Sequence, residues 1–201
     1  MKSFFKNFII VALSAILITL IIQTNEKTYD NLDELEINYI DVGQGNAVLV
    51  KSAGKTLLID GGNRSNSRYY YNFIKNQKIK KVDYMIASHY DEDHIAGLIA
   101  ILSNYKVSNV FCPDYTKDTK IYKSFKESLI KSKAKIIHPN IGDEFSLGEA
   151  KVKIIWPKEY KIGVDNDNSI VVKITYGKMS FLFPADASKN VEDELIYSGY
   201  N

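Results

Sequence analysis

The sequence predicts an α/β (α+β) fold, a four-layer α/β/β/α sandwich in which two mostly antiparallel sheets face each other and carry helices outside. Two observations predict this class. Strand-like and helix-like patterns alternate between residues 82 and 138, whereas strand-like runs follow one another before and after that region. Alternation is typical of sheets covered by helices, and consecutive strands joined by short turns pair antiparallel.

The composition is that of a folded protein of about one domain. Of the 201 residues, 45% are hydrophobic and 25% are charged, which argues against disorder. The net charge of +2 argues neither for nor against a nucleic-acid partner, and the only arginines, Arg64 and Arg68, indicate no cluster for bidentate phosphate binding. Cys112 is the one cysteine, which excludes an internal disulfide and a thiolate zinc site.

Residues 1–25 predict a signal peptide or an N-terminal transmembrane anchor. Lys2 and Lys6 precede an apolar run over residues 8–22, and the boundary at 21–25 offers no good site for a signal peptidase, which favours the uncleaved anchor. The two lysines place the N-terminus in the cytoplasm. We therefore expect a single-pass protein of the cell membrane with its body outside, or a secreted protein.

Residues 26–34 are polar and acidic and predict a linker, and residues 35–201 form the domain. Turn residues at 43–45 and 52–55 separate the first three strands, which should pair antiparallel. We expect helices over residues 67–77, 94–104, 120–133 and 190–197. Strands are expected over residues 35–40, 47–51, 56–60, 82–87, 107–111, 135–138, 144–147, 150–156, 169–176 and 179–184.

The stretch 88–97 collects two of the three histidines and three carboxylates between a buried strand and an apolar helix. His89 and Asp91 are two residues apart, so an extended backbone points their side chains the same way, and Asp93 and His94 follow as the helix begins. The helix dipole favours the carboxylates as anions. Imidazole suits Zn, Fe or Mn, and carboxylates move the preference towards harder ions. The spacing indicates a metal site, and the alternative is a solvated acidic loop with incidental histidines.

This stretch resembles the His-x-His/Asp-x-Asp-His motif of the metallo-β-lactamase-fold hydrolases. More narrowly, it resembles the branch that contains the hydrolase domain of ComEC competence proteins and the phosphorylcholine esterases. Four further segments resemble motifs of that branch in the same order, so the resemblance covers about residues 36–190. These segments are residues 41–45, 58–62, 166–172 and 181–187.

The resemblance implies a centre of two divalent metal ions, zinc above all and manganese as the alternative. It assigns His89 and Asp91 to one ion, Asp93 and His94 to the other, and Asp186 as a bridging carboxylate. A metal-bound hydroxide between the ions would be the nucleophile, and Asp93 would also orient it as the catalytic residue.

Three further residues are expected around the ligands. Asp60 is expected to support them without binding metal. Asn168 and Ser169 would line the pocket, unless they only form an Asn-rich turn. The chain departs from the branch at Asn46, where an aspartate is usual, and at Ala185, where a glycine is usual. If the backbone at Ala185 has a positive φ, the methyl group would cost about 1 kcal/mol.

The family's final ligand would come from a His-His-Gly-Ser motif beyond the last predicted strand, and the sequence ends at Asn201 without it. We therefore expect a domain incomplete at its C-terminus, a fragment of a longer reading frame. His138, the remaining histidine, falls at a strand end and is a poor substitute.

These implications favour a metal-dependent hydrolase of phosphodiesters or phosphomonoesters outside the cell. The expected partners are an ester or phosphoester substrate, with DNA as one candidate, and a membrane contacted through the N-terminal segment. Two alternatives stay open. One is a membrane-anchored, non-catalytic binding domain of the same fold, and the other is a hydrolase of another ester, thioester or lactam class. The sequence indicates no oligomeric state.

Overall fold

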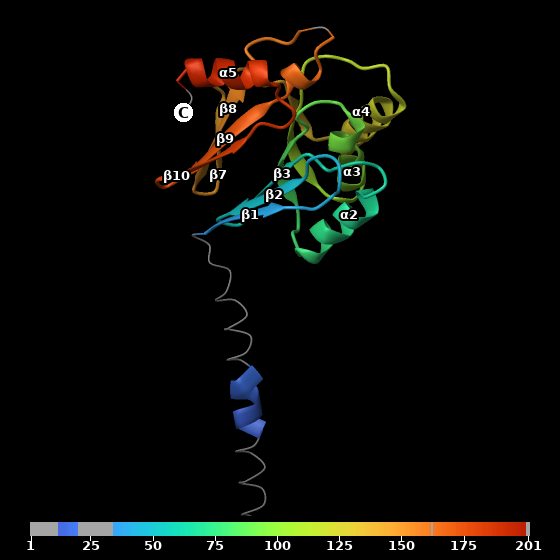
Figure 1. The fold of residues 1–201 in the computed structure, drawn as a ribbon. Helices are drawn as coiled ribbons and strands as arrows, with labels where there is room; N and C mark the ends of the chain where they lie inside the picture. Colours follow the sequence, from blue (N-terminus) through green and yellow to red (C-terminus); the bar gives the residue numbers. More distant parts are fainter. Residues whose placement is uncertain (1–11, 20–33, 162, 200–201) are drawn as a thin grey trace, which may run out of the picture. The chain divides into compact units, whose positions relative to one another are not determined.

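The computed structural model describes residues 12–19, 34–161 and 163–199 (Figure 1). It divides into two units, Met1–Asp33 and Glu34–Asn201, which we describe separately. In the first unit residues 12–19 are helical, and the rest of the predicted anchor and residues 26–33 of the predicted linker lie outside the described residues. Among the described residues, no helix has the length and apolar character that crossing a membrane requires.

The larger unit contains a six-stranded sheet in the order β1-β2-β3-β4-β5-β6 (Figure 1). The first three strands pair antiparallel, as predicted, but β3 to β6 run parallel. The prediction of a mostly antiparallel sheet is therefore wrong for this half, because each helical connection carries the chain back to the same end of the sheet. The strands are Leu35–Tyr39, Val48–Ser52, Lys55–Ile59, Val82–Ile86, Val107–Phe111 and Lys135–Ile137.

The second sheet has four strands in the order β10-β9-β8-β7, and all its neighbours pair antiparallel, as predicted. Its strands are β7 (Glu144–Leu147), β8 (Ala150–Trp156), β9 (Val171–Tyr176) and β10 (Met179–Phe183). A short 3-10 helix, η1 (Asn166–Asn168), lies between β8 and β9. The helix α5 (Lys189–Tyr197) packs on the outer face through Val191 and Leu195, which contact Ile155, Trp156 and Val171.

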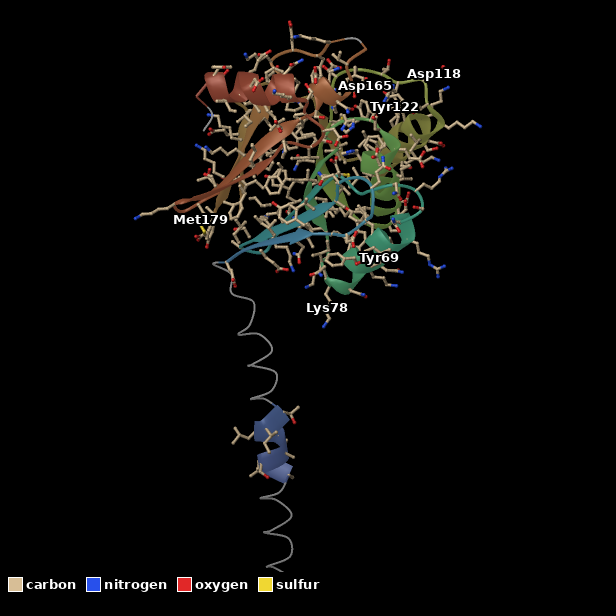
Figure 2. All side chains as sticks on the ribbon, in the orientation of Figure 1. Tyr69, Lys78, Asp118, Tyr122, Asp165 and Met179 are labelled. Atoms are coloured by element: carbon tan, nitrogen blue, oxygen red, sulfur yellow. The ribbon has the colours of Figure 1, made fainter. Side chains whose placement is uncertain are left out.

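Three apolar layers separate the four layers of the sandwich. The first lies between the six-stranded sheet and its helices, which are α2 (Ser67–Asn76), α3 (Glu92–Asn104) and α4 (Lys120–Ser132). The second joins the facing sides of the two sheets, and the third lies under α5. Figure 2 shows side chains filling these spaces, whereas Tyr69 and Lys78 lie on the outside. The predicted α/β/β/α sandwich is confirmed.

The carboxyl ends of β3 and β4 lie side by side, since the two strands pair in parallel up to Ile59 and Ile86. Both strands are buried, and the turns that leave them, together with the start of α3, carry five of the eight predicted site residues. The helix α3 begins at Glu92, two residues before the predicted start, with Asp91 as its N-cap. The first turn of α3 therefore holds Asp93 and His94 rigidly at this edge of the sheet.

Candidate metal centre

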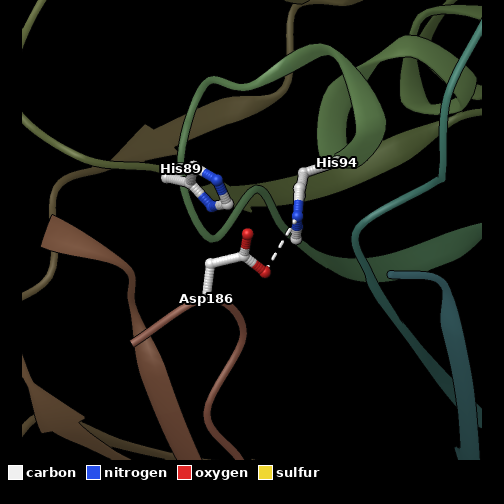
Figure 3. A group of neighbouring side chains, drawn as sticks. All are labelled: His89, His94 and Asp186. Carbon is white, nitrogen blue, oxygen red and sulfur yellow. Dashed lines mark ion pairs between the residues drawn. The ribbon is translucent and has the colours of Figure 1, made fainter. Parts of the chain in front are cut away.

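Two histidines and one carboxylate from the two sheets meet at this edge (Figure 3). His89 lies on the turn after β4, His94 in the first turn of α3, and Asp186 on the loop after β10. Each offers a ligand atom within 4.8 Å of the other two, and Asp186 Oδ1 lies 3.2 Å from His94 Nε2. The imidazole ring centroids are 4.1 Å apart.

The polar atoms of this group lack the partners that buried polar atoms normally have. His89 is 0% and His94 1% exposed, and the Nε2 atom of each makes no hydrogen bond to the described residues. The 3.2 Å approach of Asp186 to His94 is an ion-pair distance without hydrogen-bond geometry. Two buried imidazoles without a hydrogen bond at Nε2, each with a ligand atom close to one carboxylate, form a donor set that suits a divalent cation.

Asp60, at the end of β3, holds the ring of His94 from behind. Its carboxylate lies 2.8 Å from His94 Nδ1 and accepts hydrogen bonds from Ser88 N at 2.8 Å, Ser88 Oγ at 2.7 Å and Asn46 Nδ2 at 3.1 Å. A proton on Nδ1 leaves the lone pair of Nε2 directed at Asp186, as in metal sites where a carboxylate orients a histidine ligand. Asp60 therefore occupies a supporting position.

Burial and charge shift the pKa values of Asp60 and His94 in opposite directions. Burial would raise the pKa of Asp60, but the hydrogen bond and charge of His94 outweigh it and hold this pKa below its ordinary value. Burial would lower the pKa of His94, but Asp60 outweighs it, and with Asp186 and Asp93 it raises this pKa to about 9. A metal ion that binds His94 Nε2 therefore has to displace a proton.

The two acidic residues at the start of α3 face different neighbours. Asp91 Oδ2 lies 3.6 Å from His89 Nε2, and Asp91 Oδ1 accepts a hydrogen bond from Lys117 Nζ. The close approach of His89 and then the hydrogen bond with Lys117 hold the pKa of Asp91 well below its usual range. Asp93 Oδ2 faces Gln44 Nε2 at 3.4 Å and does not join the group of three.

Of the two predicted pocket residues, Ser169 contacts a candidate ligand and Asn168 bonds elsewhere. Ser169 is fully buried, and its Oγ lies 3.4 Å from His89 Nδ1, so it contacts a candidate ligand. The side-chain amide of Asn168 bonds instead to the backbone of Lys161, donating to O at 2.6 Å and accepting from N at 2.8 Å. His138 lies apart from the group of three, with Nδ1 2.9 Å from Cys112 O.

Sequence reasoning missed the roles of Ser88 and Lys117. Ser88 Oγ contacts Asp60 and lies 3.1 Å from His89 Nδ1 and 3.4 Å from His94 Nδ1, so one hydroxyl links both histidines. Its place inside the motif could have drawn attention to it. Lys117 belongs to the loop before α4, and no spacing connects it to Asp91. Only the folded chain brings it there.

Comparisons with known proteins find relatives of this fold. The family model of the metallo-beta-lactamase superfamily matches residues 40–200. ComE operon protein 3 of Bacillus subtilis is 25% identical over 185 residues, and Recombination protein 2 of Haemophilus influenzae is 25% identical over 167 residues. Each match covers 81% of this chain but only 23% and 19% of the relatives, so the chain spans about a fifth of their length.

Solved structures show the same fold at low identity. The metallo-beta-lactamase fold protein YhfI of Bacillus subtilis matches with a TM-score of 0.55 and 17% identity, covering 76% of this chain and 63% of that protein. MEM-A1, a subclass B3 metallo-beta-lactamase from a soil metagenome library, matches with a TM-score of 0.51 and 16% identity, covering 73% and 58%.

Proposed function

The chain belongs to the metallo-beta-lactamase superfamily, and from this premise we propose that it is a metal-dependent hydrolase of phosphodiesters or phosphomonoesters. Superfamily membership and the resemblance to ComEC-type proteins support a hydrolase fold that uses divalent metal. The observation that carries the proposal is that two buried histidines, whose Nε2 atoms make no hydrogen bond to the described residues, each place a ligand atom within 4.8 Å of a carboxylate oxygen of Asp186.

His89, His94 and Asp186 would hold one ion, and Asp91 and Asp93 are the remaining carboxylates for a second. Imidazole suits zinc, and the number of carboxylates also permits manganese. When bound, the ions would lower the pKa of a water molecule and polarise the phosphoryl oxygens of the substrate.

Asp93 is the residue that we propose as catalytic. The first turn of α3 fixes its backbone, and Gln44 Nε2 lies 3.4 Å from its carboxylate. From this position it can orient the attacking water and accept its proton. Asp91 in place of a second histidine makes the donor set rich in oxygen, which favours phosphoryl transfer over lactam hydrolysis.

The test is hydrolysis of bis-p-nitrophenyl phosphate by the full chain with Mn²⁺ or Zn²⁺. Asp93→Asn should lower kcat by about 100-fold or more, because a positioned general base contributes about that much. Asp118→Asn, an exposed aspartate paired with Lys123, is the matched control and should leave the rate unchanged. Turnover of a β-lactam or a thioester without turnover of the phosphodiester would overturn the proposed substrate class.

A second candidate is a binding domain of the same fold without turnover. The ion pairs of Lys117 with Asp91 and with Asp165 favour it, because they compensate Asp91 without a metal ion. Metal content separates the two candidates. One or two ions bound to each purified chain support the hydrolase, and a chain that takes up no Zn²⁺ or Mn²⁺ supports the binding domain.

We also propose that residues 1–25 act as a membrane anchor or as a cleaved signal, with the body outside the cell. The leading lysines and the long uncharged run support this location. Fractionation of cells that express a C-terminally tagged chain, followed by external protease, tests it. A tag that stays in the cytosolic fraction, protected from the protease, would contradict both versions. Outside the cell, DNA is one candidate among the phosphodiester substrates.

A further inference from the structure

A cavity of about 290 Å³ with three cationic side chains in its lining adjoins the candidate metal centre. Arg64, Lys117 and Lys120 line it, together with the carboxylates of Asp91 and Glu92. The three cations come from three places, the turn after β3, the loop after β5 and the first residue of α4. Folding therefore gathers a positive group that the spacing along the sequence does not indicate.

The three cations of this cavity differ in whether a carboxylate of the protein already binds them. Lys117 is only 20% exposed and is bound on two sides, by Asp91 and by Asp165 Oδ2 at 2.7 Å. Figure 2 shows Asp165 beside the region where α4 begins. In the described part of the chain, by contrast, no hydrogen bond or ion pair engages the side chain of Arg64 or Lys120. Two cations thus remain free to meet an anion.

Asp91 forms a wall that the cavity shares with the candidate metal centre. It lines the cavity, and its Oδ2 lies 3.6 Å from His89 Nε2. An anion in this cavity would therefore lie across Asp91 from the candidate metal centre. The positive end of the α4 dipole points the same way, since Lys120 and Ile121 open that helix and line the cavity.

We infer that this cavity binds a second phosphate group of the substrate, so that the preferred substrate is a chain of successive phosphodiesters. The inference rests on the proposed function and adds to it a substrate class. Arg64 would bind the phosphate through its planar fork and Lys120 as a point charge. The carboxylate of Glu92 in the same lining would repel a phosphate, so the phosphate should bind on the Arg64 and Lys120 side of the cavity.

A matched pair of esters tests the inference on the metal-loaded full chain. One is the p-nitrophenyl ester of thymidine 5′-phosphate, and the other carries an added 3′-phosphate. We expect KM to be about tenfold lower for the ester with two phosphates. Arg64→Gln with Lys120→Gln should remove this difference. Arg68→Gln with Lys75→Gln removes the same charge from exposed positions on α2 and should preserve the difference.

Binding of thymidine 3′,5′-bisphosphate, measured by calorimetry, gives a readout that needs no turnover. The double variant at Arg64 and Lys120 should bind it about tenfold more weakly and with a shallower salt dependence. Equal binding by this variant and the unchanged chain would overturn the inference, even if both esters are hydrolysed. Lack of hydrolysis of both esters would instead overturn the proposed function, so the two failures are distinguishable.

Successive phosphodiesters occur both in a nucleic-acid strand and in a polyol phosphate chain. Competition against the bisphosphate by a thymidine tetranucleotide and by a glycerol phosphate tetramer distinguishes them. Competition by either chain, lost in the double variant, supports the subsite and identifies its source. Competition by neither chain would overturn the inference.

Discussion

At the scale of single residues, the site depends on how firmly His94 is held. Asp60 faces His94 Nδ1 while it binds the backbone and hydroxyl of Ser88, and it does so with a φ of 58°, in the left-handed region. Such a conformation costs a non-glycine residue about 1–2 kcal/mol. The hydrogen bonds from Ser88 and the contact with His94 compensate for this cost.

Asp60→Asn should therefore damage both stability and metal binding. An amide NH₂ near Nδ1 would favour a proton on Nε2 of His94, and we expect metal affinity to fall about 10- to 100-fold and the free energy of unfolding to fall by about 1–3 kcal/mol. Calorimetric zinc titration and urea unfolding measure the two effects. Asp83→Asn is the control, since Asp83 is also buried but binds Thr56 and Lys81. If both variants lost metal affinity equally, the orienting role of Asp60 would be wrong.

The raised pKa of His94 predicts a pH dependence of the metal-free chain. This pKa rises from an ordinary 6.5 to about 9, so the protonated ring stabilises the fold fully below about pH 6.5. That stabilisation is lost as the pH rises through 9. Urea unfolding in the presence of a chelator should show a falling free energy of unfolding over this window, and His94→Gln should lack this slope. A flat profile for the unchanged chain would contradict the charge pairing of His94 with Asp60.

Ala185, next to Asp186, has a φ of 51°, so the condition for strain at this replacement of the family's glycine is met. Glycine would relieve about 1–2 kcal/mol of strain and would lose about 0.4–1 kcal/mol through the freer unfolded chain. Ala185→Gly should therefore stabilise the protein by up to about 1.5 kcal/mol in urea unfolding. Ala187→Gly, at a position without positive φ, should destabilise it. A loss of stability in both variants would contradict the strain at Ala185.

At the scale of elements, α3 packs against the end of β3 through direct backbone contacts. Gly61 N donates to His94 O at 2.7 Å, and Gly97 N donates to Gly62 O at 3.4 Å. A Cβ on Gly97 would meet Gly61 O at 2.0 Å and the ring of Tyr70 at 2.8 Å. No side chain larger than hydrogen fits there, and this contact keeps His94 in register with Asp60.

Gly97→Ala should push α3 away from the sheet and destabilise the protein by about 1–3 kcal/mol, the usual cost of overpacking. It should also weaken metal binding, because the separation moves His94 relative to Asp60. Chemical unfolding and zinc titration measure the two effects. Ser103→Ala, on the exposed side of the same helix, should change neither by much. Unchanged stability in Gly97→Ala would mean that the backbone contact is not needed.

Local patterns were enough to predict most elements, because each segment's own sequence contains the apolar periodicity and the turn residues that define a helix or a strand. The prediction failed where distant segments decide the outcome. The parallel pairing of β3 with β4 depends on how α2 returns the chain, and the contact of Lys117 with Asp91 depends on the loop before α4. His89, His94 and Asp186 could be predicted together only through the resemblance to a family, since spacing alone does not bring Asp186 to the histidines.

At the scale of the whole molecule, the candidate centre joins the two halves of the sandwich. His89 and His94 follow β4 of the six-stranded sheet, and Ser169 and Asp186 lie on the loops before β9 and after β10 of the four-stranded sheet. Ile170 N also donates to Ser88 O at 2.9 Å across the same boundary. A bound ion would therefore link the sheets directly, and its binding free energy would add to the stability of their packing.

Metal removal should consequently lower the thermal stability of the entire domain. Zinc at 100 times its Kd contributes about 2.7 kcal/mol, which for a domain of this size corresponds to a Tm increase of roughly 5–10 °C. Scanning calorimetry with zinc and with a chelator measures the difference. Asp186→Asn should lose most of it because the ion then bonds mainly to one sheet, whereas Asp193→Asn, exposed on α5, should keep it. An equal zinc effect in both variants would show that Asp186 does not connect the sheets through the ion.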